Sequence, residues 1–200
     1  MHKPLGGMSD DKPLLVVLAG PNGAGKSTFF TAFLKDLSLP FLNADILARK
    51  TGIDAYAAAR EITAVRELFV RLKRSFILET VLSDPVGDKV RFAASAAESG
   101  FDVQLIFIGI ETSDLSKQRV RDRVAAGGHD VPDEKLEARF KRTLRNLERS
   151  IEQLPHVTIY DNTAYDSPFR FVAEFQNGQM TRQGSTPEPG WAQPYLPQQP

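Results

Sequence analysis

The sequence contains no cysteine. Disulfide bonds, thiolate metal sites and a cysteine nucleophile are therefore excluded. No apolar run approaches the roughly 20 residues that a membrane-spanning helix needs, and the first residues lack the apolar core of a signal peptide. These absences lead us to expect a cytoplasmic protein with no membrane partner.

The chain also has no excess of either charge. Lys and Arg number 25, Asp and Glu number 25, and the formal net charge is +0. Such a balance argues against a nucleic-acid-binding protein, because those proteins carry a strongly basic surface. A length of 200 residues with 42% hydrophobic content predicts one domain with a substantial core.

The most informative segment is rich in glycine. Residues 14–19 form a continuous apolar run, which is typical of a strand buried on both faces of a parallel sheet. An amphipathic helix is expected over residues 29–37. The segment between them matches G-x-x-x-x-G-K-[ST] and continues with a threonine; it consists of Gly20, Pro21, Asn22, Gly23, Ala24, Gly25, Lys26, Ser27 and Thr28.

This pattern predicts a phosphate-binding loop. Glycines let several backbone N–H groups converge on one phosphate, and the following helix adds the positive end of its dipole. Lys26 is then expected to reach the β and γ phosphates of ATP, and the Ser27 hydroxyl to hold Mg²⁺. The alternative is a glycine-rich turn that binds nothing, which the flanking strand and helix disfavour.

Strand and helix patterns alternate along the chain. Five apolar strand candidates are separated by helical segments, at 14–19, 41–43, 76–78, 103–110 and 157–160. With the phosphate loop, this order predicts an α/β P-loop NTPase fold: a three-layer sandwich whose mostly parallel five-stranded sheet has helices on both faces. Partial alternation over 169–175, followed by a tight Asn-Gly turn, predicts a C-terminal hairpin.

Three regions of the chain are expected to differ in organisation. Residues 1–12 have no structural pattern and are interpreted as a flexible leader, and residues 13–182 form the P-loop domain. Residues 183–200 form a tail rich in Pro and Gln that lacks the apolar content to fold alone. Trp191, Tyr195 and Leu196 give that tail the means to dock on the domain or on a partner.

Polar residues follow the predicted strands where the strands end. Asn43 and Asp45 come after the second strand, and Glu79 and Thr80 end the third. Because the carboxyl ends of parallel strands share one edge of the sheet, these side chains are expected to face the phosphate loop. Asp45 could accept the proton of an acceptor hydroxyl or hold Mg²⁺ through water; the alternative is an N-cap of the next helix.

Glu79 stands at the end of an apolar strand, where an unpaired charge is costly. It is expected to bind substrate hydroxyls or to help position Mg²⁺. The alternative is a structural role as a helix cap or as half of a buried salt bridge.

Arginines flank a Gly-Gly-His break at residues 127–129 and suggest a lid over about 119–142. Arg119 and Arg123 are four residues apart on one helix face, and Arg139 and Arg142 lie beyond the break. Such arginines could close over phosphates and neutralise charge in a transition state. Interleaved Asp and Glu residues leave a solvated helix face as the alternative.

The ordered set LAGPNGAGKST, FLNAD, FILET, RVAAGGHDVP and YDN resembles the zeta toxin family of P-loop kinases, over roughly residues 14–162. The resemblance implies an ATP-dependent kinase that transfers the γ-phosphate to a sugar hydroxyl of UDP-N-acetylglucosamine. It also implies a small antitoxin protein as a partner, which shields the nucleotide site.

The resemblance also assigns roles to residues. It makes Lys26 the phosphate-binding lysine, Ser27 the hydroxyl on the metal side and Asp45 the proton acceptor. It implies that Asn43, Glu79 and Thr80 contact substrate, that Arg123 is one transition-state arginine, and that Arg139 is the second, with Arg142 in reserve.

Two other interpretations remain open. In the first interpretation, the protein is a kinase whose acceptor is another nucleotide, a dinucleotide or a small sugar. In the second, the chain is a nucleotide-binding module without turnover that binds a partner, for which the aromatic residues of the tail are the support.

Overall fold

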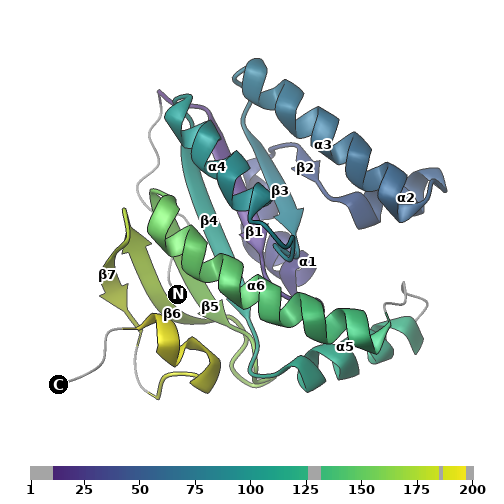
Figure 1. Cartoon of the computed structure of the whole chain (residues 1–200), viewed down its shortest axis with the longest axis vertical. Coiled ribbons are helices and arrows are strands. Elements are labelled where there is room, and N and C mark those ends of the chain that lie inside the picture. The colour runs from purple at the N-terminus through teal and green to yellow at the C-terminus, as the bar shows by residue number, and fades with distance from the viewer. Residues whose placement is uncertain (1–10, 126–131, 185–186, 197–200) are drawn as a thin grey trace.

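The computed structural model describes residues 11–125, 132–184 and 187–196. Its centre is one sheet of seven strands in the order β2-β3-β1-β4-β5-β6-β7 (Figure 1). The first five strands run parallel and are β1 (Leu14–Ala19), β2 (Phe41–Leu42), β3 (Phe76–Thr80), β4 (Asp102–Gly109) and β5 (His156–Asp161). The last two are antiparallel and are β6 (Arg170–Gln176) and β7 (Gln179–Gln183).

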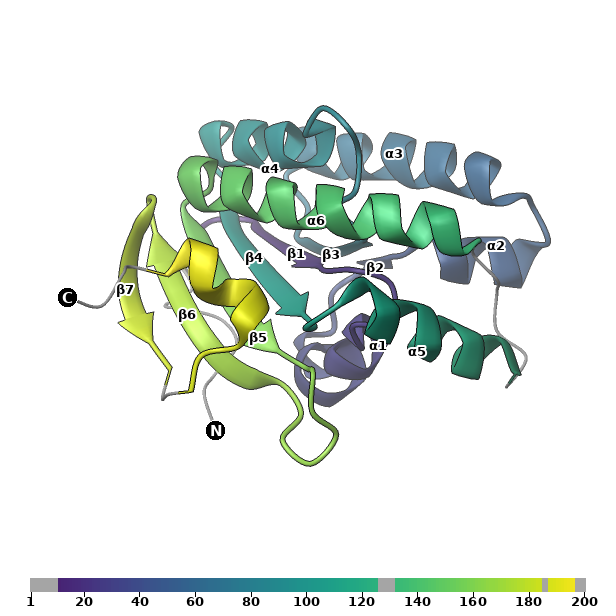
Figure 2. The same ribbon diagram turned by 60° about the horizontal axis from the view of Figure 1, so that its bottom comes forward.

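Helices cover both faces of this sheet, as Figure 2 shows. One face carries α3 (Ala55–Arg71), α4 (Asp88–Glu98) and α6 (Asp133–Gln153). The other face carries α1 (Lys26–Phe29), which continues as a π-helical turn η1 (Phe30–Leu34) and a 3₁₀ turn η2 (Lys35–Leu37). The remaining helical elements are α2 (Ala44–Thr51), α5 (Ser113–Ala125) and η3 (Gly190–Tyr195).

The core lies on both sides of the central strand, as the continuous apolar run predicts. Leu15 and Val17 of β1 pack into the cluster on the α4 face, whereas Val16 and Leu18 pack into the cluster on the α1 face. All four side chains are at most 1% exposed. Because successive side chains of a strand point to opposite faces, only an uninterrupted apolar run fills both clusters.

The prediction of five strands was wrong, since the C-terminal hairpin belongs to the same sheet. The hairpin itself is present as β6 and β7, and β6 pairs with the outer edge of β5. β5 is buried along nearly its whole length, so an uncovered edge there would leave backbone donors and acceptors without partners. The alternation over 169–175 predicts a strand and carries no information about the edge that the strand joins.

The C-terminal 3₁₀ helix η3 packs on this domain. The Trp191 ring lies 5.9 Å from the Phe107 ring, and its Nε1 donates a 2.9 Å hydrogen bond to Asp161 Oδ1. Gly109 makes room for the indole, because a Cβ there would lie 2.1 Å from a Trp191 ring carbon. The Tyr195 hydroxyl donates to the Leu144 carbonyl at 3.2 Å.

We therefore expect Trp191→Ala to lower the free energy of unfolding by about 3 kcal/mol, the range for deleting a buried aromatic side chain. The variant also leaves the buried Asp161 without one of its donors. Urea unfolding followed by circular dichroism measures the change. Trp191→Phe, which keeps an aromatic ring but lacks the second ring of the indole and its N–H, should lose less. A loss below about 1 kcal/mol for Trp191→Ala would show that η3 does not contribute to the core.

Among the described residues, no helix is both long and apolar enough to cross a membrane. The expected Gly-Gly-His break at 127–129 lies outside those residues, as does most of the expected leader.

Candidate nucleotide and acceptor site

The phosphate loop emerges from the middle of the sheet. β1 pairs with β3 on one side and with β4 on the other, so the loop opens where the strand order reverses. Gly20 has φ +145° and passes so close to β4 that a Cβ would lie 2.2 Å from the Ile108 carbonyl oxygen. Gly25, with φ +89°, is the N-cap of α1, so the first N–H groups of that helix are left for a ligand.

Lys26 begins α1, and its side chain turns back into the loop. Its Nζ donates to the carbonyls of Gly20 at 2.9 Å and Pro21 at 3.0 Å. Burial lowers the pKa of Lys26, the negative charges of Glu79 and Asp45 raise it, and Arg123 lowers it further. The structure therefore brings Lys26 within electrostatic range of three of the predicted site residues.

Asn43 and Asp45 follow the end of β2, where Asn43 caps a helix and Asp45 exposes its carboxylate. Asn43 is buried, and its Oδ1 accepts a 3.0 Å hydrogen bond from the Ile46 N–H, so Asn43 is the N-cap of α2. Asp45 lies in the first turn of α2 and is exposed. Within the described part of the chain its carboxylate makes no hydrogen bond, which leaves it available to an incoming hydroxyl.

Glu79 is held beside α1 by the register of the sheet. Leu18 of β1 pairs with Glu79 of β3, and the Ser27 hydroxyl donates to Glu79 Oε2 at 3.2 Å. A hydroxyl and a carboxylate oxygen at the phosphate loop match the hard oxygen ligands that Mg²⁺ prefers. Thr80 is buried, and its hydroxyl accepts from the Leu82 N–H at 3.0 Å, so Thr80 shapes the turn after β3.

Helix α6 fixes the loop after β3 through its side chains. Thr143 Oγ1 donates to the Val81 carbonyl at 2.8 Å, and Asn146 Nδ2 donates to the carbonyls of Leu82 and Asp84 at 2.8 and 2.9 Å. Arg142 Nε donates to the Ser83 carbonyl at 2.7 Å. Arg142 is thus engaged in holding this loop.

The predicted lid arginines occupy separate places. Arg123 lies in α5 and interacts electrostatically with Lys26. Arg139 lies in α6 and interacts with Lys89 of α4. The structure therefore brings Arg123 within electrostatic range of Lys26 in the phosphate loop, whereas Arg139 acts on Lys89 of α4.

Arg119 joins α5 to the phosphate loop in a way that the sequence did not reveal. Its guanidinium donates to the carbonyls of Gly23 at 3.4 Å, Asn162 at 2.8 Å and Thr163 at 3.0 Å, and its Cζ lies 4.8 Å from the Tyr165 ring centre. Asn162 Nδ2 in turn donates to the Ala24 carbonyl at 2.8 Å. The YDN motif, which spans the end of β5 and Asn162, was the available signal for this contact of the Asn162 side chain.

A cavity of about 340 Å³ opens beside these residues, and Glu79 is not among the residues that line it. Its lining combines glycine backbone, aromatic rings and polar groups, from Gly23, Gly25, Thr28, Arg119, Asp122, Asn162, Ala164, Tyr165, Pro168 and Phe169. A cavity with flat apolar walls next to a phosphate loop suits a planar base attached to a polyphosphate.

The glycine-rich turn after β1, its buried lysine and the largely parallel sheet define a P-loop α/β protein of the NTPase class. The chain belongs to the AAA domain family AAA_33, whose sequence profile matches residues 15–150. The finer assignment to the zeta toxin family remains a prediction.

Comparison with individual proteins supports the fold. The chain is 27% identical over 133 residues to an uncharacterized protein of Haemophilus influenzae, covering 62% of this chain and 91% of that protein. A chain of the AvrRxo1-ORF1:AvrRxo1-ORF2 crystal structure with ATP superposes with TM-score 0.62 at 20% identity, covering 85% of this chain. The PezAT toxin-antitoxin structure of Streptococcus pneumoniae gives TM-score 0.54 at 19% identity, covering 84% of this chain and 72% of that one. This chain spans 60% of the length of the AvrRxo1 chain. At identities of 19 and 20%, the two solved structures show that the fold is shared and nothing more.

Proposed function

We propose that this protein is an ATP-dependent kinase that transfers the γ-phosphate to a hydroxyl group of a small molecule. The main observation that supports this proposal is that the Asp45 and Glu79 carboxylates lie within electrostatic range of the buried Lys26. A phosphate loop alone indicates nucleotide binding, whereas an unengaged carboxylate facing it supplies the base that an alcohol acceptor requires.

ATP would bind with its phosphates on the N–H groups of the loop at residues 20–28. The Lys26 ammonium, which now binds the Gly20 and Pro21 carbonyls, would turn to the β and γ phosphates. The base would enter the cavity beside Arg119 and Tyr165. The solved AvrRxo1 complex with ATP, which shares this fold, supports the choice of nucleotide.

Mg²⁺ would be held by the Ser27 hydroxyl, with Glu79 beside it. When bound, Mg²⁺ neutralises charge on the β and γ phosphates.

The reaction then follows from the positions of the charged groups. Asp45 accepts the proton of the acceptor hydroxyl as its oxygen forms a bond to the γ-phosphorus. The bond between that phosphorus and the bridging oxygen of ADP breaks, and ADP leaves. Lys26 and Arg123 stabilise the negative charge that spreads over the transferring group.

For the acceptor we propose UDP-N-acetylglucosamine, on the strength of the zeta toxin resemblance. The fold shared with the PezAT toxin-antitoxin structure supports a search for a small antitoxin partner. Another nucleotide, a dinucleotide or a small sugar is the alternative acceptor. A non-catalytic partner module loses its support, because the aromatic residues of the tail pack on the chain's own core.

Phosphorus NMR tests this function. The protein is incubated with ATP, Mg²⁺ and UDP-N-acetylglucosamine, and a new sugar phosphate is expected together with ADP. Inducible bacterial expression of the wild type beside Lys26→Ala, with comparison of extracted metabolites, identifies a different acceptor. If neither experiment yields an ATP-dependent phosphorylated product, the kinase proposal fails.

A further inference from the structure

The cavity beside the phosphate loop has two walls, and hydrogen bonds fix each of them. One wall is α5, which docks on the loop through Ser116 and Arg119. Ser116 is buried, and its Oγ donates to the Asn22 carbonyl at 2.7 Å. The Arg119 Cβ fills the space beside Gly23, since a Cβ added to that glycine would lie 3.0 Å from it. Helix α5 therefore has a defined position at the cavity.

The other wall is the loop between β5 and β6. Asn162 Oδ1 accepts from the Phe169 N–H at 3.3 Å, which closes the loop at its base. The Phe169 ring meets the Phe29 ring of α1 edge-on, with 5.2 Å between the ring centres. Tyr165, midway along the loop, is 77% exposed and lies on the Arg119 guanidinium. A cavity bounded by flat groups that are fixed relative to the phosphate loop suits the planar base of a nucleotide.

Among the described residues that line this cavity, two carry a charge, and only one of these is engaged. The Arg119 guanidinium donates to three backbone carbonyls, as described above. Asp122 lies three residues further along α5, about one turn away on the same face of the helix. Within the described part of the chain, its carboxylate forms no hydrogen bond or ion pair. The cavity is therefore lined by a free hydrogen-bond acceptor on a firmly held helix.

The other polar side chains of the lining do not discriminate between bases in the way that a carboxylate does. Asn162 already accepts from the Phe169 N–H and donates to the Ala24 carbonyl. The hydroxyls of Thr28 and Tyr165 donate as well as accept, so they suit an amino group and a carbonyl group equally. An ionised carboxylate only accepts. It binds an amino group of a base and repels a carbonyl oxygen at the same position.

We propose that Asp122 selects the base of the bound nucleotide by accepting a hydrogen bond from the 6-amino group of adenine. This inference rests on the proposed function and names the residue that makes ATP the phosphoryl donor. Guanine and hypoxanthine carry a carbonyl oxygen at the same position of the ring, so the carboxylate would face a second acceptor. Because Asp122 is exposed, water screens the interaction. We therefore expect a preference of about tenfold, well below the ratios of fully buried sites.

Calorimetric titration with ADP, GDP and inosine diphosphate, whose base is hypoxanthine, tests this assignment in the presence of Mg²⁺. The wild type should bind ADP about tenfold more tightly than either of the other two. In Asp122→Asn the ratio should fall to near one, because an amide accepts from an amino group and donates to a carbonyl. The ratio is the informative quantity. A change in fold, or the loss of a negative charge near the phosphates, alters the affinity for all three diphosphates together.

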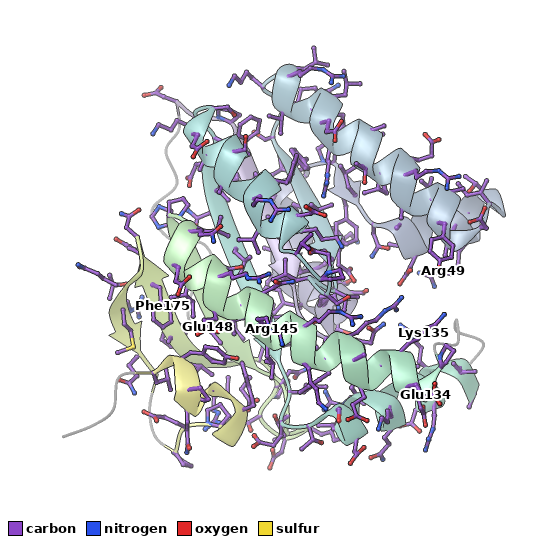
Figure 3. The ribbon with its side chains drawn as sticks, in the orientation of Figure 1. Arg49, Glu134, Lys135, Arg145, Glu148 and Phe175 are labelled. Carbon is purple, nitrogen blue, oxygen red and sulfur yellow. The ribbon has the colours of Figure 1, made fainter. Side chains whose placement is uncertain are left out.

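Two variants control for the loss of charge. Asp114→Asn alters an exposed aspartate of the same helix, which is paired with Lys117 and does not line the cavity. Glu148→Gln alters an exposed carboxylate of α6, which also lies outside the cavity lining (Figure 3). Both variants should keep the wild-type preference for ADP, because neither changes the acceptor that faces the base.

A wild-type ratio near one, an unchanged ratio in Asp122→Asn, or tighter binding of GDP than of ADP overturns the assignment of Asp122. The titration does not depend on turnover. Selective binding of ADP without any ATP-dependent product would contradict the kinase proposal alone. Phosphoryl transfer that uses ATP, GTP and inosine triphosphate equally well would contradict the assignment of Asp122 alone. If none of the three diphosphates binds, both proposals fail.

Discussion

Lys26→Ala is expected to lower kcat/KM for phosphoryl transfer by about 10³-fold, equivalent to about 4 kcal/mol of transition-state stabilisation. The ammonium is buried, anchored at the phosphate loop and surrounded by the charges of Asp45, Glu79 and Arg123. No other cation begins α1, so water would have to replace it between the β and γ phosphates. Coupled measurement of ADP release gives the rate.

Lys35→Ala is the control for this change, because Lys35 is an exposed lysine two turns further along the same helical segment. It should retain the wild-type rate. Melting temperatures separate loss of chemistry from loss of fold. A Lys26→Ala protein that is folded and turns over within about tenfold of the wild type would show that the lysine does not act on the transferring phosphate.

Asp45→Asn should lower kcat by about 10³-fold and leave the affinity for ATP almost unchanged. The amide has the shape of the carboxylate but cannot accept the hydroxyl proton. Helix α2 should tolerate the change, since its cap is Asn43 and the Asp45 side chain is exposed. Single-turnover kinetics measures the chemical step, and equilibrium titration with a fluorescent ATP analogue measures binding.

Asp36→Asn, which alters an exposed carboxylate in η2, is the matched control and should behave as the wild type. If Asp45→Asn keeps a near-normal kcat, the proton acceptor is another group. If it instead loses ATP affinity while keeping kcat, Asp45 serves Mg²⁺ or the nucleotide. Both outcomes would contradict the assignment of Asp45 as the base.

Local residue patterns predicted most of the parallel sheet, because each pattern indicates the secondary structure of the segment in which it occurs. The apolar run at 14–19 fixed β1 as a strand buried on two faces, and the glycine motif fixed the turn after it. The position of β6 beside β5 was not predictable in the same way. Strand pairing is decided by which buried edge remains open once the other strands are in place.

The contacts of the candidate site also fall into those that local patterns predict and those that they do not. Glu79 reaches Ser27 because β1 and β3 are neighbours in register, and a parallel sheet predicts that convergence of strand ends. The contacts of Arg119 with Asn162 and of Asn146 with Leu82 join a side chain to a backbone carbonyl far away in the sequence. Any residue type supplies such a carbonyl, so no motif marks the acceptor.

The anchored position of η3 has a consequence for how the domain should be delimited. Asp161, which binds the Trp191 indole, is followed directly by Asn162, which binds the phosphate loop at Ala24. Deleting the residues from Gly190 onward would expose the Phe107 ring and the hollow over Gly109 to water. The Gly109 carbonyl accepts a 2.8 Å hydrogen bond from the N–H of Asn162, so the exposed hollow lies next to the residue that supports the loop. A shortened chain that ends at β7 would therefore have an uncovered part of its core beside the P-loop. It should bind nucleotide more weakly than the chain that includes η3.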